Sequence, residues 1–115
     1  MNQNLKYNDL VSIVEQGIYQ LNPVAYVEPA TEMPEEVTLG DFVARGGSLM
    51  LIDREDASLA GTFNRDKINE AAEKFLEMQG GETDFYNEFR ELNINLEDGE
   101  AEILELAAFG EVVYG

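Results

Sequence analysis

The chain has 115 residues, 44% of them hydrophobic, and its 24 acidic side chains against 7 basic ones give a formal net charge of −17. It contains neither cysteine nor histidine, which excludes disulfides, thiolate chemistry, the Ser-His-Asp arrangement and nearly all structural zinc sites. We therefore expect one domain over residues 1–115 that performs no catalysis and holds no cofactor or metal.

The N-terminal part of the chain predicts a core helix followed by an edge strand. Asn8 is a suitable N-cap for a helix whose apolar residues recur at helical spacing until Asn22-Pro23 ends it. Gly17 inside this helix indicates a close packing contact with a neighbouring element. Residues Val24–Val27 lie among the prolines of the chain and predict a short edge strand.

The middle of the chain predicts a short helix, a central strand and a longer helix. Thr38 begins the short helix, because Asp41 three residues on completes a capping box, and Gly46-Gly47 ends it. The apolar run Ser48–Asp53 predicts a buried strand at the centre of a small sheet, and the polar segment after it is expected to be a connection. Asn64 caps the clearest helix of the chain.

The long helix is expected to run to about Gln79, where Gly80-Gly81 ends it. Thr83 is then placed to cap a further helix that carries Leu92 on its inward side.

The C-terminal segment allows two interpretations. Residues 94–96 alternate between apolar and polar, and Asp98-Gly99 is a hairpin signal. Residues 100–109 are instead rich in Ala, Leu and Glu, with Gly110 in the position of a helix stop. We favour strand, turn and helix, followed by Val112–Tyr114 as a final strand or a docked tail.

Together these elements predict an α+β fold in a single small domain. We expect three to four helices packed on a small sheet built around Ser48–Asp53, with short edge strands near Val24–Val27 and the C-terminus.

The surface chemistry favours protein partners. No apolar run approaches the roughly 20 residues that a membrane span needs. The basic residues are few and scattered, which argues against direct binding of nucleic acid or membrane lipid. We expect a cytoplasmic protein that binds a basic surface of another protein, and the sequence gives no indication of a homo-oligomer.

Acidic residues recur at steps of three and four along three of the predicted helices. Such steps bring carboxylates onto one helix face, where each like-charge neighbour costs about 0.2 to 0.5 kcal/mol of helix stability. Glu70 with Lys74 is one clear compensating pair. Because the chain keeps these repulsive neighbours, we expect a partner whose positive charge relieves the repulsion. The predicted partner-binding residues are Asp66, Glu70, Glu73, Glu77, Asp84, Glu88, Glu91, Asp98, Glu102 and Glu105.

In size, charge and lack of catalytic residues, the chain is similar to small acidic inhibitors that phages and mobile elements direct against host nucleases, restriction systems or CRISPR effectors. The similarity covers composition and no motif. It implies a non-enzymatic inhibitor or regulator that acts in the host cytoplasm. Its acidic ridges would occupy the groove of a nucleic-acid-handling enzyme as a DNA or RNA mimic.

Two other interpretations fit the same composition. One is a structural adaptor of a virion or other assembly, which would bind neighbours by strand addition and through Tyr26 and the Val112–Tyr114 tail. The other is adaptation to high salt, in which solvent cations screen the acidic faces. Any amphipathic helix exposes a charged face, so the stripes alone do not decide between these interpretations.

Overall fold

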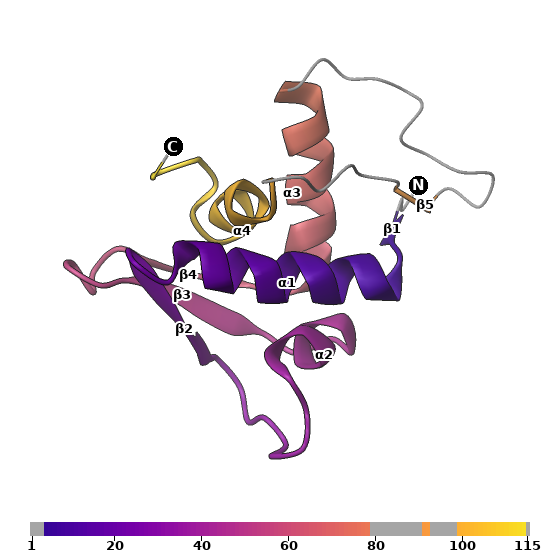
Figure 1. The fold of residues 1–115 in the computed structure, drawn as a ribbon, viewed down its shortest axis with the longest axis horizontal. Coiled ribbons are helices and arrows are strands. Elements are labelled where there is room, and N and C mark those ends of the chain that lie inside the picture. The colour runs from indigo at the N-terminus through magenta and orange to yellow at the C-terminus, as the bar shows by residue number, and fades with distance from the viewer. Residues whose placement is uncertain (1–3, 79–90, 93–98, 115) are drawn as a thin grey trace.

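The computed structural model describes residues 4–78, 91–92 and 99–114 (Figure 1). Within these residues it has the predicted α+β fold, with four helices and a three-stranded antiparallel sheet. A separate parallel pair joins β1 to β5. The elements in chain order are β1 (Asn4–Leu5), α1 (Tyr7–Leu21), β2 (Ala25–Pro29), α2 (Leu39–Ala44), β3 (Leu49–Asp53), β4 (Ala60–Phe63), α3 (Arg65–Met78), β5 (Glu91–Leu92) and α4 (Glu100–Phe109).

The main sheet has the strand order β2-β3-β4, with both pairs antiparallel. The apolar run that predicted a central strand is β3, and the predicted edge strand is β2. The second edge strand is β4, which lies partly in the segment that was expected to be a polar connection. Residues 110–114 form no strand, so the expectation of an edge strand near the C-terminus is wrong.

The hydrophobic core lies between one face of this sheet and the helices. Leu49 and Leu51 of β3 and Phe63 of β4 are almost completely buried there, together with Ala25 of β2. In Figure 1, α1 and α4 lie on this side of the sheet. The alternation expected for a sheet covered on one face is only partial, because Ile52, next to Leu51 in β3, is buried as well.

The first helix begins earlier than predicted. Its N-cap is Lys6, whose side chain makes no capping hydrogen bond, and Asn8 lies inside the helix. A contact distant in the sequence fixes the chain here, because the Leu5 N–H donates to Asn69 Oδ1 at 2.7 Å. The prediction that Asn8 is the cap is therefore wrong.

The start signals of α2 and α3 are confirmed. Thr38 Oγ1 accepts a hydrogen bond from the Asp41 N–H at 3.1 Å, and Asn64 Oδ1 accepts one from the Lys67 N–H at 3.0 Å. Both bonds satisfy backbone donors that the first turn of a helix leaves unpaired. Gly46, after α2, has the left-handed φ of 106° expected at a helix stop.

The helix predicted from Thr83 to Leu92 is wrong at its C-terminal end. Glu91 and Leu92 form β5, which pairs in parallel with Asn4 and Leu5. The rest of that predicted helix lies outside the described residues. No helix within the described part of the chain is both long and apolar enough to cross a membrane.

Helix α4 confirms the favoured interpretation of residues 100–109. It ends at Gly110, whose φ of 81° is left-handed, and the hairpin alternative is wrong for these residues. The predicted strand at 94–96 lies outside the described residues. α4 packs against α1, α3 and β4, so it contacts both helices and the sheet.

Side chains from two other helices hold the ends of α4. Gln20 of α1 accepts a hydrogen bond from the Ala101 N–H and donates one to Glu100 Oε1, each at 3.2 Å. Lys74 Nζ of α3 donates to the Gly110 carbonyl oxygen at 3.1 Å. These bonds pair backbone groups at both helix ends, and the lysine places a cation where the helix dipole is negative.

Two glycines let α1 and β4 approach α4 closely. A Cβ atom on Gly17 would lie 2.5 Å from Leu104 Cδ1, which confirms the packing contact predicted for this residue. A Cβ atom on Gly61 would overlap the carbonyl oxygen of Ala108. The second position is the less tolerant of the two, because a backbone carbonyl cannot rotate away as a leucine side chain can.

We predict that Gly61→Ala lowers the free energy of unfolding by about 1 to 3 kcal/mol or more, because β4 and α4 must separate to admit the methyl group. Thr62→Ala, at the exposed neighbouring position, is the control and should change stability by less than about 0.5 kcal/mol. Urea denaturation of both variants measures the difference. Equal stability of the two variants would contradict the close approach.

Candidate functional site

Helix α3 presents four carboxylates on the side opposite its buried apolar residues. Asp66, Glu70 and Glu77 are exposed and Glu73 is half-buried. Their spacing places them within about 60° of arc on a helix, so they form one stripe. We call these four residues the acidic face of α3. The buried residues of the same helix are Ile68, Asn69, Ala71, Ala72 and Phe75.

The lysines of α3 lie beside this stripe. At about 100° per residue, Lys67 and Lys74 project to one side of the carboxylates. Lys67 Nζ donates to the Thr62 carbonyl oxygen at 3.1 Å, and Lys74 Nζ donates to that of Gly110. Lys74, which was expected to compensate the charge of Glu70, therefore donates a hydrogen bond at the C-terminal end of α4.

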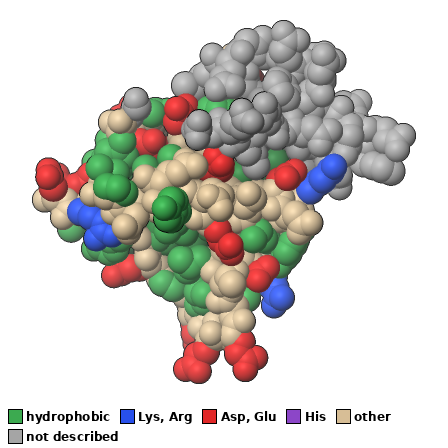
Figure 2. All heavy atoms as spheres, in the orientation of Figure 1, with side chains coloured by type: hydrophobic (Ala, Val, Ile, Leu, Met, Phe, Trp, Pro, Cys, Tyr) green, Lys and Arg blue, Asp and Glu red, His purple; other side chains and the backbone are tan. Residues whose placement is uncertain are grey.

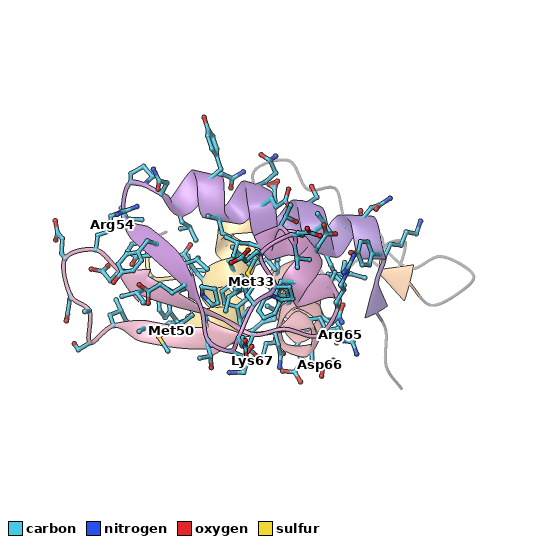
Figure 3. All side chains as sticks on the ribbon, turned by 90° about the horizontal axis from the view of Figure 1, so that it is seen from below. Met33, Met50, Arg54, Arg65, Asp66 and Lys67 are labelled. Carbon is cyan, nitrogen blue, oxygen red and sulfur yellow. The ribbon has the colours of Figure 1, made fainter. Side chains whose placement is uncertain are left out.

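Two arginines also direct their guanidinium groups to carbonyl oxygens. Arg54 Nε donates to the Asn22 carbonyl at 2.6 Å, and Arg65 Nη1 lies 3.5 Å from that of Ala44. Figure 3 shows Arg65, Asp66 and Lys67 near one another at the lower middle of the view and Arg54 at the upper left. Several of the few cations thus have structural roles at chain turns and helix ends.

The acidic ridge predicted along α4 is not exposed as expected. Glu102 is half-buried, and Glu105 has only 2% of its surface exposed. Glu105 Oε1 accepts hydrogen bonds from the N–H groups of Val113 at 2.9 Å and Tyr114 at 2.6 Å. The prediction that Glu105 belongs to an exposed ridge is wrong, because the C-terminal tail folds back and uses this carboxylate as its acceptor.

The other residues of the predicted acidic ridges do not lie in a helix that the structure describes. Glu91 lies in β5, and Asp84, Glu88 and Asp98 lie outside the described residues. The acidic face of α3 is therefore the one predicted stripe for which the structure describes every member.

Other carboxylates are spread over the surface. Glu32, Glu35 and Glu36 are exposed in the loop between β2 and α2, and Glu55 and Asp56 are exposed after β3. On the face shown in Figure 2, apolar and uncharged groups separate the acidic side chains. Among the described residues, no group of three or more Asp or Glu side chains is placed to hold a metal ion.

The C-terminal tail is docked by a network of contacts whose partners could not be predicted from the sequence. The Tyr114 hydroxyl donates to Asp53 Oδ2 at 2.5 Å, and its ring lies edge-on to Phe109 with 6.3 Å between centroids. The hydrogen bond from Tyr114, followed by backbone N–H groups of Asp56 and Glu55, lowers the pKa of Asp53. Partial burial, and then the hydrogen bond to Asp53, raises the pKa of Tyr114 to about 12. Of the two outcomes expected for Val112–Tyr114, a final strand or a docked tail, the structure has the docked tail, and the polar groups at 113 and 114 have partners within the chain.

Glu105→Ala should lower the free energy of unfolding by about 1 to 3 kcal/mol, because two backbone N–H groups lose their acceptor. Glu105→Gln retains an acceptor oxygen and should lose less than the alanine variant. Chemical denaturation compares the two. A glutamine variant as unstable as the alanine variant would show that the negative charge, and not the acceptor, holds the tail.

The Tyr114 contact predicts a loss of stability at high pH. The folded-state pKa of about 12 exceeds the ordinary value of 10.0, so the stabilisation is complete below pH 10 and is lost as the pH rises towards 12. The lowered pKa of Asp53 acts in the opposite range, and its contribution is lost as the pH falls below 3.8 through the folded value. Thermal melts of the natural chain and of Tyr114→Phe across pH test both expected losses of stability, at high pH and at low pH. The phenylalanine variant should lose the dependence above pH 10, and identical alkaline profiles would contradict the assignment.

Comparisons of the chain with protein-family models, with curated proteins and with solved structures find no match. The candidate site is therefore assigned from the exposure, spacing and charge of the α3 residues in this chain.

Proposed function

We propose that this chain is a non-enzymatic protein-binding inhibitor or regulator that presents the acidic face of α3 to a basic surface of another protein. The observation that carries the proposal is the exposure of Asp66, Glu70 and Glu77, with Glu73 beside them, on a helix whose opposite side is fixed in the core. A face held in this way presents its charges without a further ordering step, which favours association.

The charge balance supports a basic partner. Neighbouring carboxylates at steps of three and four residues repel one another by about 0.2 to 0.5 kcal/mol each. Lys67 and Lys74 lie to one side of the stripe and donate to backbone oxygens. A positively charged surface placed against the stripe relieves the repulsion and steers the encounter.

The geometry of the stripe favours a nucleic-acid-binding protein as the partner. Carboxylates on consecutive turns lie about 5 to 6 Å apart along a straight helix. Nucleic acid also presents a regular row of negative charges, and grooves that bind it are lined with Lys and Arg. The acidic face of α3 would occupy such a groove as a nucleic-acid mimic.

The test is capture of partners from a cell lysate by the immobilised chain at low and moderate salt. The triple variant Glu70→Lys, Glu73→Lys, Glu77→Lys should lose most of the capture, and capture by the natural chain should fall steeply as salt rises, because exposed charges are screened. Mass spectrometry identifies the proteins that bind. Double-stranded DNA added to the resin should release them if the chain occupies a nucleic-acid groove.

The matched control is Glu32→Lys, Glu35→Lys, Glu36→Lys, which changes the charge equally at exposed positions of the β2–α2 loop. This control should retain capture. Equal loss from both triple variants would show that net charge matters and position does not, which contradicts a docking face on α3.

A further inference from the structure

The two faces of the main sheet carry different side chains. In the register of the sheet, the odd-numbered residues face the core, where Ala25, Leu51 and Phe63 are buried. The even-numbered residues share the opposite side, which we call the outer face of the sheet. Its members are Val24, just before β2, and Tyr26, Glu28, Met50, Ile52, Ala60 and Thr62.

The outer face is more apolar than a sheet face in contact with solvent usually is. An antiparallel sheet covered on one side commonly has polar residues on the other. Here Val24 is 39% exposed, and Ile52 is only 6% exposed although it lies outside the hydrophobic core cluster. Arg54 belongs to the same face, since its guanidinium lies over the Tyr26 ring, 5.6 Å from the ring centroid. The centre of the outer face is therefore apolar, with an arginine at one end.

The helices that pack on the sheet lie on its core side. α1 contacts β2, α3 and α4 contact β4, and Figure 1 shows these helices on one side of the sheet. Figure 3 is seen from below, and Met50 and Arg54 both lie in its left half with the strands of the sheet. Within the described part of the chain, no helix packs on the sheet from the outer side.

The dimensions of the outer face match one helix. Three strands about 4.8 Å apart, each about five residues long at roughly 3.3 Å per residue, give a surface roughly 15 Å by 17 Å. A helix with its side chains is about 10 to 12 Å across, and about eleven residues span 17 Å. A second copy of the chain is disfavoured there, because two chains of net charge −17 repel each other. The charge therefore favours a helix from a basic partner.

A hollow at one end of the outer face suits a basic side chain. It has a volume of about 230 Å³ and is lined by Pro23, Val24, Asp53, Arg54, Glu55 and Tyr114. Arg54 already donates hydrogen bonds to Asn22, and Asp53 accepts one from Tyr114, whereas Glu55 is an exposed carboxylate. Pro23 and Val24 can contact the aliphatic part of a lysine while Glu55 pairs with its ammonium group.

A second exposed carboxylate stands towards the other end of the same face. Glu28 lies on β2, four residues beyond Val24 at the hollow. Four residues of strand span about 13 Å, which is the length of about nine residues of helix. The outer face therefore offers an apolar centre between two negative positions that one helix can reach.

We propose that the outer face of the sheet binds an amphipathic helix of another protein, whose apolar stripe is bordered by Lys or Arg. The stripe lies on Tyr26, Met50 and Ile52, with one cation in the hollow beside Glu55 and another about nine residues away beside Glu28. Burial of the stripe supplies affinity, and the two charge pairs select a basic helix over an acidic one. The outer face is separate from the acidic face of α3, and the proposal does not rest on that face.

The probe is a fluorescein-labelled synthetic peptide of about 18 residues, with Leu at helical spacing on one side and Lys on both borders of that stripe. Fluorescence anisotropy measures its binding to the purified chain at about 0.15 M salt, which screens long-range attraction. A peptide of the same composition in scrambled order is the control, because it keeps the charge and loses the stripe. The striped peptide should bind about tenfold more tightly or better. Equal binding of the two peptides would overturn the proposal.

Two pairs of variants locate the site. Met50→Gln places an amide in the apolar centre and should weaken binding of the striped peptide about fivefold or more, whereas Tyr19→Gln, at a 78% exposed position of α1, should leave it unchanged. Glu28→Lys should weaken binding about threefold or more, and Glu70→Lys, the same charge change on the acidic face of α3, should not. Thermal melts check that each variant still folds.

The outcomes separate this proposal from the function proposed for α3. Binding that is weakened by Glu70→Lys and insensitive to Glu28→Lys and Met50→Gln would overturn the outer-face site and place the peptide on α3. Binding that responds to Glu28→Lys and Met50→Gln alone would support the outer-face site, even if the triple lysine variant of α3 retained its capture of partners. Equal binding of a peptide with Glu in place of every Lys would contradict the two charge pairs.

Discussion

The seating of α4 between α1, α3 and β4 is the constraint on which the rest of this fold depends. Gln20 holds the N-terminal end of the helix, and Lys74 holds its C-terminal end. Close approach on two sides requires glycine at 17 and 61. Once α4 is in place, Glu105 is available to bind the tail, and the tail in turn reaches Asp53 of the sheet. Helices, sheet and C-terminus are thus coupled through one buried helix.

The carboxylates of the described residues fall into two groups with different physical roles. Those that are buried or half-buried at contacts, such as Glu100, Glu105 and Asp53, accept hydrogen bonds from within the chain. Such groups tolerate burial because their charge is satisfied by donors. The acidic face of α3 belongs to the second group, whose members are directed to solvent. A count of acidic residues therefore overstates the charge that is available to a partner.

Features with a local signal could be predicted from the sequence. The caps at Thr38 and Asn64, the stop at Gly110 and the buried strand β3 each follow from residues within a few positions of one another. The α3 stripe was also predictable, since helical spacing alone sets which residues share its exposed side.

The features that were missed depend on contacts distant in the sequence. The start of α1 is set by Asn69, the burial of Glu105 by a tail that returns to it, and the β1–β5 pair by residues far apart in the chain. The second edge strand, β4, carries Ala60, Gly61 and Thr62, which lack the apolar alternation typical of a strand. Periodicity in one segment contains no information about which other segment will cover it, so these assignments required the fold.

Pro29 has no backbone N–H, and the Thr62 carbonyl oxygen already accepts a hydrogen bond from Lys67. Both features limit the addition of further strands to the sheet and therefore favour solubility. A sheet with two fully open edges can add copies at both sides and grow without limit into fibres. Here one edge lacks a donor at its end, and the other has an acceptor already occupied. Growth by repeated strand addition is thereby discouraged at both sides.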